Sequence, residues 1–137
     1  MEKEVKKIVI FVFAAIFIAH FWATAASWYW NFPWFDIPMH FFGGFWVVAV
    51  FAYLNLRFSL KIFEGKNLLT SLILAVSFAA LIGVFWEFFE FLLDFFKNSM
   101  DISKMAQMGI ADTMGDLFFD LVGGTAFILL FQKFFKQ

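Results

Sequence analysis

Cysteine is absent from this 137-residue sequence, and Lys and Arg are absent from its long apolar runs except for Lys133 near the end of the last run. Without cysteine the chain has neither a disulfide framework nor a thiolate metal site, which excludes the commonest structural zinc sites. A formal net charge of −1 gives no global attraction to nucleic acid. A Walker phosphate-binding loop, a His-Glu-x-x-His zinc motif and a Gly-x-Ser-x-Gly nucleophile motif are also missing. These familiar signatures therefore assign no reaction.

Apolar residues, by contrast, make up 64% of the chain, and 25 of its residues are Phe. This composition is far from that of a soluble domain. A transmembrane helix needs about 20 mostly apolar residues. Runs of this length lie near residues 8–30, 37–56, 68–96 and 113–135. The sequence therefore predicts an all-α fold in a lipid bilayer: one integral membrane domain over residues 1–137, built as an antiparallel four-helix bundle.

Basic residues are distributed unevenly among the predicted loops and ends. The third loop holds two of the ten, and the first loop holds none. The other eight lie at the two ends or in the second loop: Lys3, Lys6, Lys7, Arg57, Lys61, Lys66, Lys133 and Lys136. Because basic loops stay in the cytoplasm, we expect a multi-pass cell membrane protein with both termini cytoplasmic. The aromatic segment 28–34 would then form a belt at the outer interface.

Seven of the eleven acidic residues lie in or beside the apolar runs. They are Asp36, Glu87, Glu90, Asp94, Asp112, Asp116 and Asp120. A bare carboxylate in hydrocarbon costs at least a few kcal/mol, so such groups are paired, protonated or bound to metal. Since the one Lys or Arg in the runs, Lys133, lies at the opposite end of its run from the acidic residues, protons or metal ions must neutralise these carboxylates. Function is expected where they gather.

The predicted topology brings most of these side chains to the outer half of the bilayer, at about 1.5 Å of rise per residue. The residues expected there are Asp36 and His40 from the second helix, Glu87 and Glu90 from the third, and Asp112, Asp116 and Asp120 from the fourth. Spacings of three, four or eight residues place those of each helix on one stripe. Carboxylate metal sites in helical bundles are built this way. We therefore predict a divalent metal site with these seven residues as ligands.

Some polar residues also have simpler interpretations. Asp36 and Asp112 stand at helix starts, where a carboxylate can satisfy free backbone N–H groups, a role compatible with metal binding. Asp94 is assigned to the membrane interface rather than to the site. His20 is alone in the first helix, and a lone membrane histidine often hydrogen-bonds a neighbouring helix. The methionine-containing stretch 99–110 is expected to rest on the interface as an amphipathic segment.

A weak internal repeat relates two of the predicted helix starts. Asp36-x-x-x-His40-x-x-Gly43-Gly44 aligns with Asp116-x-x-x-Asp120-x-x-Gly123-Gly124. The repeat suggests two helical hairpins related by a pseudo-twofold axis along the membrane normal, as in parallel repeats of transporters. The glycine pairs would allow the second and fourth helices to approach closely.

Three segments carry a resemblance to a known family. They are Asp36-Ile37-Pro38-Met39-His40-Phe41-Phe42-Gly43, Phe85-Trp86-Glu87-Phe88-Phe89-Glu90 and Asp112-Thr113-x-x-Asp116-x-x-x-Asp120-x-x-Gly123. The chain from the second helix onward resembles the YjdF-like family, small membrane proteins of unassigned activity. A looser similarity runs to the VanZ-like proteins, whose usual Arg before the last helix is missing here. The resemblance supplies no reaction, but it implies a shared polar site. The residues of that site are Asp36, His40, Glu87, Glu90, Asp112, Asp116 and Asp120.

Two functions are compatible with such a site. The first is divalent-metal binding, either alone or as part of a metal-dependent enzyme that acts on a lipid-linked or membrane-soluble substrate. Oxygen ligands suit Mg²⁺, Mn²⁺ or Ca²⁺, and an added His also permits Zn²⁺ or iron. The alternative is an ion- or proton-conducting transporter or channel subunit, or a structural membrane protein. Conduction would require a homo-oligomer and polar residues in the inner half, where the sequence offers few. Metal binding is therefore favoured, with the metal and the reaction left open.

Overall fold

The computed structural model describes residues 1–99, 106, 107 and 109–135. Its helices are α1 (Glu2–Ala25), α2 (Trp28–Asn31), η1 (Pro33–Phe35), α3 (Asp36–Arg57), α4 (Leu68–Ser99) and α5 (Ile110–Phe135). Every regular element formed by the described residues is helical, and four spans are long and apolar enough to cross a membrane. These spans are Glu2–Ala25, Pro33–Arg57, Leu68–Lys97 and Ile110–Lys133. The predicted all-α, four-helix membrane fold is confirmed.

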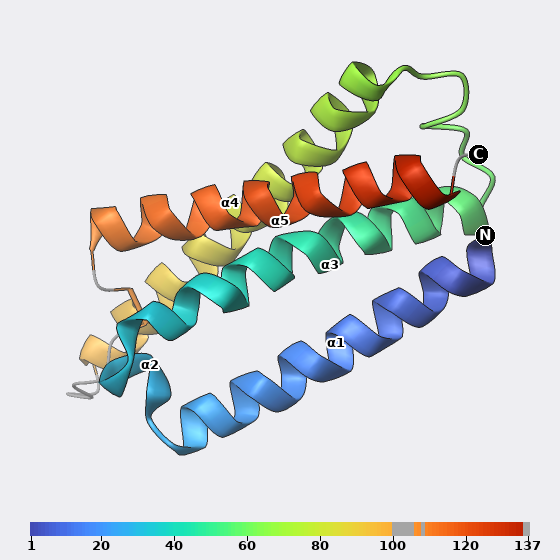
Figure 1. Cartoon of the computed structure of the whole chain (residues 1–137). Helices are drawn as coiled ribbons and strands as arrows, with labels where there is room; N and C mark the ends of the chain where they lie inside the picture. The colour runs from blue at the N-terminus through green and yellow to red at the C-terminus, as the bar shows by residue number, and fades with distance from the viewer. Residues whose placement is uncertain (100–105, 108, 136–137) are drawn as a thin grey trace.

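Helix α3 is the centre of the arrangement, because it packs against α1, α4 and α5. Figure 1 shows α1 along one side of α3 and α5 along another, with α4 crossing near α5. The start of α1 and the end of α5 lie at one end of the bundle, which we call the terminal end. The short helix η1 and the starts of α3 and α5 lie at the other, which we call the η1 end. The residues predicted to form the site therefore gather at the η1 end.

The first membrane helix differs from its predicted bounds. A run of residues 8–30 was expected, whereas α1 begins at Glu2 and ends at Ala25. The helix stops there because Ser27 adopts a left-handed conformation with φ of 59°, which interrupts the right-handed backbone. The aromatic residues that follow form α2 as a separate turn. Most of the stretch 99–110, predicted to be amphipathic, lies outside the described residues.

Glycine residues bring α3 and α5 into direct backbone contact. A Cβ atom on Gly44 would overlap the backbone carbonyl of Asp120, and one on Gly123 would overlap the carbonyl oxygen of Phe41. The predicted close approach of these two helices is therefore confirmed. Because no side chain separates the backbones, acidic residues of α5 can reach the histidine on α3.

Buried residues divide the bundle along its length. The apolar core occupies the middle and the terminal half, and its largest fully buried side chains include Val48, Phe127 and Ile128. On α3 the buried stripe runs from His40 through Gly44 and Val48 to Asn55, so the same helical face is polar at the η1 end and apolar through the middle of the helix. The polar site is therefore closed off from the terminal half by packed apolar side chains.

Candidate metal centre

His40 lies between three carboxylates from two helices. Its Nε2 atom is 3.7 Å from Asp36 Oδ1 and 3.7 Å from Asp116 Oδ1, and its Nδ1 atom is 3.5 Å from Asp120 Oδ2. Asp36 precedes His40 by one helical turn on α3, and Asp116 precedes Asp120 by one turn on α5, so each pair shares a helix face. The imidazole is 6% exposed. One ring nitrogen thus faces two carboxylates and the other faces a third.

The separations between these groups suit a shared cation. Hydrogen bonds between nitrogen and oxygen span about 2.7–3.2 Å, and the two Nε2 contacts are longer. Nitrogen and oxygen ligands of zinc lie about 2.0–2.2 Å from the metal, so two ligands of one ion stand at most about 4.4 Å apart. Asp36, His40 and Asp116 each offer one ligand atom, and these atoms lie within 4.8 Å of one another. Small adjustments would let all three bind one ion.

Glu87 and Glu90 of α4 form a second group with His40. Their ligand atoms also lie within 4.8 Å of one another and of a histidine nitrogen. Glu87 is 5% exposed, and its buried Oε1 atom has no hydrogen-bond partner among the described residues. Leaving a buried acceptor unsatisfied costs about 1–3 kcal/mol, and more when the group is charged. This unpartnered oxygen points, independently of the clustering of acids, to a missing proton or cation.

Asp120 lies deeper than the two ligand groups. Its carboxylate is enclosed between α3 and α4: a Cβ on Gly43 would lie 3.7 Å from Oδ1, and a Cβ on Gly83 only 2.6 Å from Oδ2. It contacts the His40 nitrogen that faces away from Asp36 and Asp116. A carboxylate at this position commonly fixes the ring orientation of a metal-binding histidine. The arrangement therefore distinguishes Asp120 from the candidate ligands.

Basic side chains do not neutralise the cluster in the described part of the chain. There, the side chain that approaches Asp36, Asp116 and Asp120 is the imidazole of His40, and neither Glu87 nor Glu90 forms an ion pair with Lys or Arg. Several carboxylates in one poorly solvated space repel one another, so they cannot all stay ionised without a counter-charge. Protons or metal ions are therefore still needed to neutralise these carboxylates.

A comparison with protein-family models matches residues 3–137 to the family described as "Predicted membrane protein (DUF2238)". The chain belongs to this family. The match accords with the resemblance to the YjdF-like proteins, which also lack an assigned activity. No curated protein and no solved structure matches the chain. The DUF2238 assignment and the four apolar spans together make this a multi-pass membrane protein in a lipid bilayer.

Of the seven residues predicted for the site in this DUF2238 chain, one is His40 itself, and five others surround it or belong to a group with it. The seventh, Asp112, lies in the first turn of α5 and lines a pocket of about 300 Å³ together with Asp36 and Asp116. Trp34 and Phe119 contribute apolar walls to this pocket. The N-cap of α3 is Phe35, so Asp36 is not the capping residue, and its carboxylate faces His40 instead. The pocket gives the Asp36–Asp116 side of the cluster an opening.

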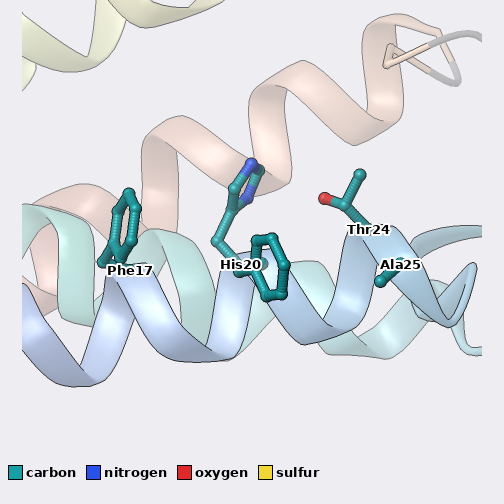
Figure 2. A pocket seen from close by; sticks show the side chains of 5 residues that line it. Phe17, His20, Thr24 and Ala25 are labelled. Carbon is teal, nitrogen blue, oxygen red and sulfur yellow. The ribbon is translucent and has the colours of Figure 1, made fainter.

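His20 lies apart from both ligand groups. Its Nδ1 atom is 2.8 Å from the Tyr29 hydroxyl on α2, so its partner lies in the segment that directly follows its own helix and not in another membrane helix. Figure 2 shows His20 with Phe17, Thr24 and Ala25 around a second pocket, of about 370 Å³. All the residues that line it come from α1, and His20 is exposed. Sequence spacing alone could not decide whether His20 forms a hydrogen bond or belongs to the polar site.

Tyr29 is a neighbour of the cluster that sequence reasoning assigned to the aromatic belt alone. Burial raises the pKa of Tyr29, and the negative charges of Asp36 and Glu90 raise it further. The phenol therefore keeps its proton at neutral pH and can donate a hydrogen bond. The sequence offered one signal for this role: Tyr29 carries a hydroxyl group and stands between two tryptophans. A tyrosine side chain has an apolar ring and a polar end, so it can pack in the aromatic belt and still reach a polar site.

Two further sets of contacts could not be predicted from the sequence. Asp94, assigned to the membrane interface, is 7% exposed and accepts hydrogen bonds from the backbone N–H groups of Ala106 and Gln107. Gln107 in turn donates its side-chain amide to Glu87. No periodic pattern marks these residues, because Gln107 lies in a connection between helices and not on a helical stripe.

Proposed function

We propose that this membrane protein binds one or two divalent metal ions at the η1 end of its bundle. The candidate ligands are His40, Asp36, Asp116, Glu87 and Glu90, with Asp120 orienting the imidazole and Asp112 at the pocket. The Oε1 atom of buried Glu87 carries the proposal, because a bound cation would supply the partner that this acceptor lacks among the described residues. Oxygen ligands with one imidazole suit Mg²⁺, Mn²⁺ or Ca²⁺ and also permit Zn²⁺ or iron.

We further propose that the site acts on a lipid-linked or membrane-soluble substrate. The pocket of about 300 Å³ beside Asp36 and Asp116 is of a size that small-molecule sites use. Its Trp34 and Phe119 walls suit an apolar chain or ring, and its carboxylates lie at the metal side. A divalent ion held there would polarise a phosphoryl or carbonyl oxygen of the substrate. Asp112, outside both ligand groups, is placed to accept a proton from the substrate or from water.

A proton-sharing cluster in an ion- or proton-conducting protein is the second candidate. It is favoured by two buried polar atoms toward the terminal end, Ser71 Oγ and Gln132 Nε2, which have no hydrogen-bond partner in the described part of the chain. Against it, fully buried apolar side chains such as Val48 and Phe127 lie between these atoms and the cluster. Metal binding at a site with one opening fits this division better than a continuous path.

Elemental analysis of the purified protein, before and after chelation, tests the proposal. We expect about one or two divalent ions per chain in a carboxylate site of this kind. Chelation should lower the melting temperature, and free ion at 100 times its dissociation constant should stabilise the fold by about 2.7 kcal/mol. Metal content near zero, with melting indifferent to chelator and to added Mg²⁺, Mn²⁺, Ca²⁺ or Zn²⁺, would decide for the proton-sharing cluster.

For orientation, we propose that both termini are cytoplasmic, which places the metal site in the outer half of the bilayer. The support is the set of basic residues at the start of α1 and in the connection from α3 to α4, including Lys3, Arg57 and Lys61. A single cysteine introduced at Ile62 should be protected from a membrane-impermeant thiol reagent added to intact cells, and a cysteine at Gln107 or Gly109 should be more accessible. External labelling at position 62 would contradict this orientation. The cysteine-free sequence provides the unlabelled background.

A further inference from the structure

Asp94 holds a short part of the α4–α5 connection against α4. Its Oδ1 and Oδ2 atoms accept from the backbone N–H of Ala106 at 2.7 and 2.8 Å, and Oδ2 also accepts from that of Gln107 at 2.8 Å. Lys97 Nζ approaches Oδ1 at 3.3 Å. Hydrogen bonds to an ionised carboxylate are among the strongest in proteins, and this carboxylate is 7% exposed. Residues 106 and 107 are therefore firmly placed relative to α4.

Gln107 in turn holds Glu87 in position through hydrogen bonds. Its Nε2 atom donates to Glu87 Oε2 at 2.9 Å and to the Glu87 backbone carbonyl at 3.1 Å. One amide group thus binds both the backbone and the side chain of the same glutamate. With Oε2 held, the carboxylate cannot rotate freely, and Oε1 is left as the oxygen that has no partner in the described part of the chain.

The chemistry of an amide suits this position. A lysine in place of Gln107 would neutralise Glu87 and compete with a bound cation, and a second carboxylate would repel it. The amide donates hydrogen bonds while leaving the full negative charge on Glu87. Groups that orient a metal ligand in this way typically change metal affinity by about 10–100-fold when they are removed.

We propose that Gln107 is a positioning residue that aims Glu87 Oε1 at the metal, and that Asp94 acts on the site through Gln107. This inference rests on the proposed metal site and extends it to the α4–α5 connection. It also revises the role of Asp94, which the sequence had set apart from metal binding. Asp94 binds no metal itself, since it belongs to neither ligand group among the described residues.

Manganese titration of the full chain in detergent, with free Mn²⁺ followed by electron paramagnetic resonance, tests the proposal. Gln107→Met keeps the length of the side chain and removes the donor. We expect it to weaken Mn²⁺ binding about 10–100-fold. Gln132→Met, the same change at the terminal end, is the matched control and should leave the affinity unchanged. The melting temperature of each metal-free variant separates loss of binding from loss of folding.

A double-mutant cycle separates positioning from a general structural effect. Asp94→Asn should also weaken Mn²⁺ binding, and adding it to Gln107→Met should weaken binding little further, because both changes release the same carboxylate. If Gln107→Met does not fold, Asp94→Asn alone should show the loss. Wild-type affinity in folded Gln107→Met or Asp94→Asn, or fully additive effects, would overturn this inference and leave the proposed metal site standing. A wild-type protein that binds no Mn²⁺ or other divalent ion would overturn both.

Discussion

Replacing His40 with Ala should weaken divalent metal binding by at least about 100-fold, a larger loss than removing an outer orienting group produces. His40 is shared by the two candidate ligand groups, so its loss removes a ligand from both. It also removes the imidazole that lies between Asp36, Asp116 and Asp120, so the carboxylates that remain repel one another without a group between them. Titration with Mn²⁺, Ca²⁺ and Zn²⁺ would measure the change.

The chain supplies its own control for this experiment. His20, its other histidine, lies on the exposed side of α1 and bonds to Tyr29 outside the ligand groups. His20→Ala should keep metal affinity within about twofold of wild type, well inside the tenfold that 1.4 kcal/mol represents. Equal affinity in His40→Ala and wild type, with both proteins folded, would contradict the proposed centre. If His20→Ala lost as much metal affinity as His40→Ala, the metal site would have to include α1.

Replacing Gly44 with Ala should destabilise the bundle by about 1–3 kcal/mol or more, the range for overpacking a close contact. The added Cβ would meet the backbone of Asp120, with atoms closer than real contacts allow. Backbone atoms cannot swing aside as a side chain can, so α3 and α5 must separate. The same separation carries Asp116 and Asp120 away from His40, and metal affinity should fall together with stability.

Gly43 is the matched control, because it is the neighbouring glycine on the same helix. A Cβ there would lie 3.7 Å from Asp120 Oδ1, which is an ordinary van der Waals contact. Gly43→Ala should therefore be tolerated, and the better helix propensity of Ala can add about 0.5–1 kcal/mol of stability. Thermal unfolding in detergent would measure both variants. Equal melting temperatures for Gly44→Ala and wild type would show that the two helices are not in backbone contact.

The membrane helices could be predicted from the sequence because a bilayer leaves the backbone few choices. A long apolar run in hydrocarbon must satisfy its own N–H and C=O groups, and a helix does so within one segment. Run length alone therefore indicates the second, third and fourth spans nearly at their observed bounds. The end of α1 could not be predicted in this way, because the left-handed turn at Ser27 interrupts an apolar run that continues into Trp28.

The membership of the acidic cluster was also accessible from the sequence. Helical spacing places Asp116 and Asp120 on one face, and equal depth in antiparallel helices brings that face to His40. These relations depend on rise and rotation per residue, which are nearly constant in every α-helix. The metal-ligand role of the cluster follows from charge without counter-charge and stays a prediction until metal is measured.

The tertiary structure decided the relations between these groups. The rotation of α3 against α5, set by the contact of Gly44 with Asp120, determines which histidine nitrogen faces which carboxylate. The fold of the α4–α5 connection brings Gln107 to Glu87, and the short helix α2 brings Tyr29 to His20. Such contacts arise from packing between elements distant in the chain, whereas local periodicity describes one helix at a time. The sequence by itself determined the helices and the charges that meet; packing decided which atoms face one another.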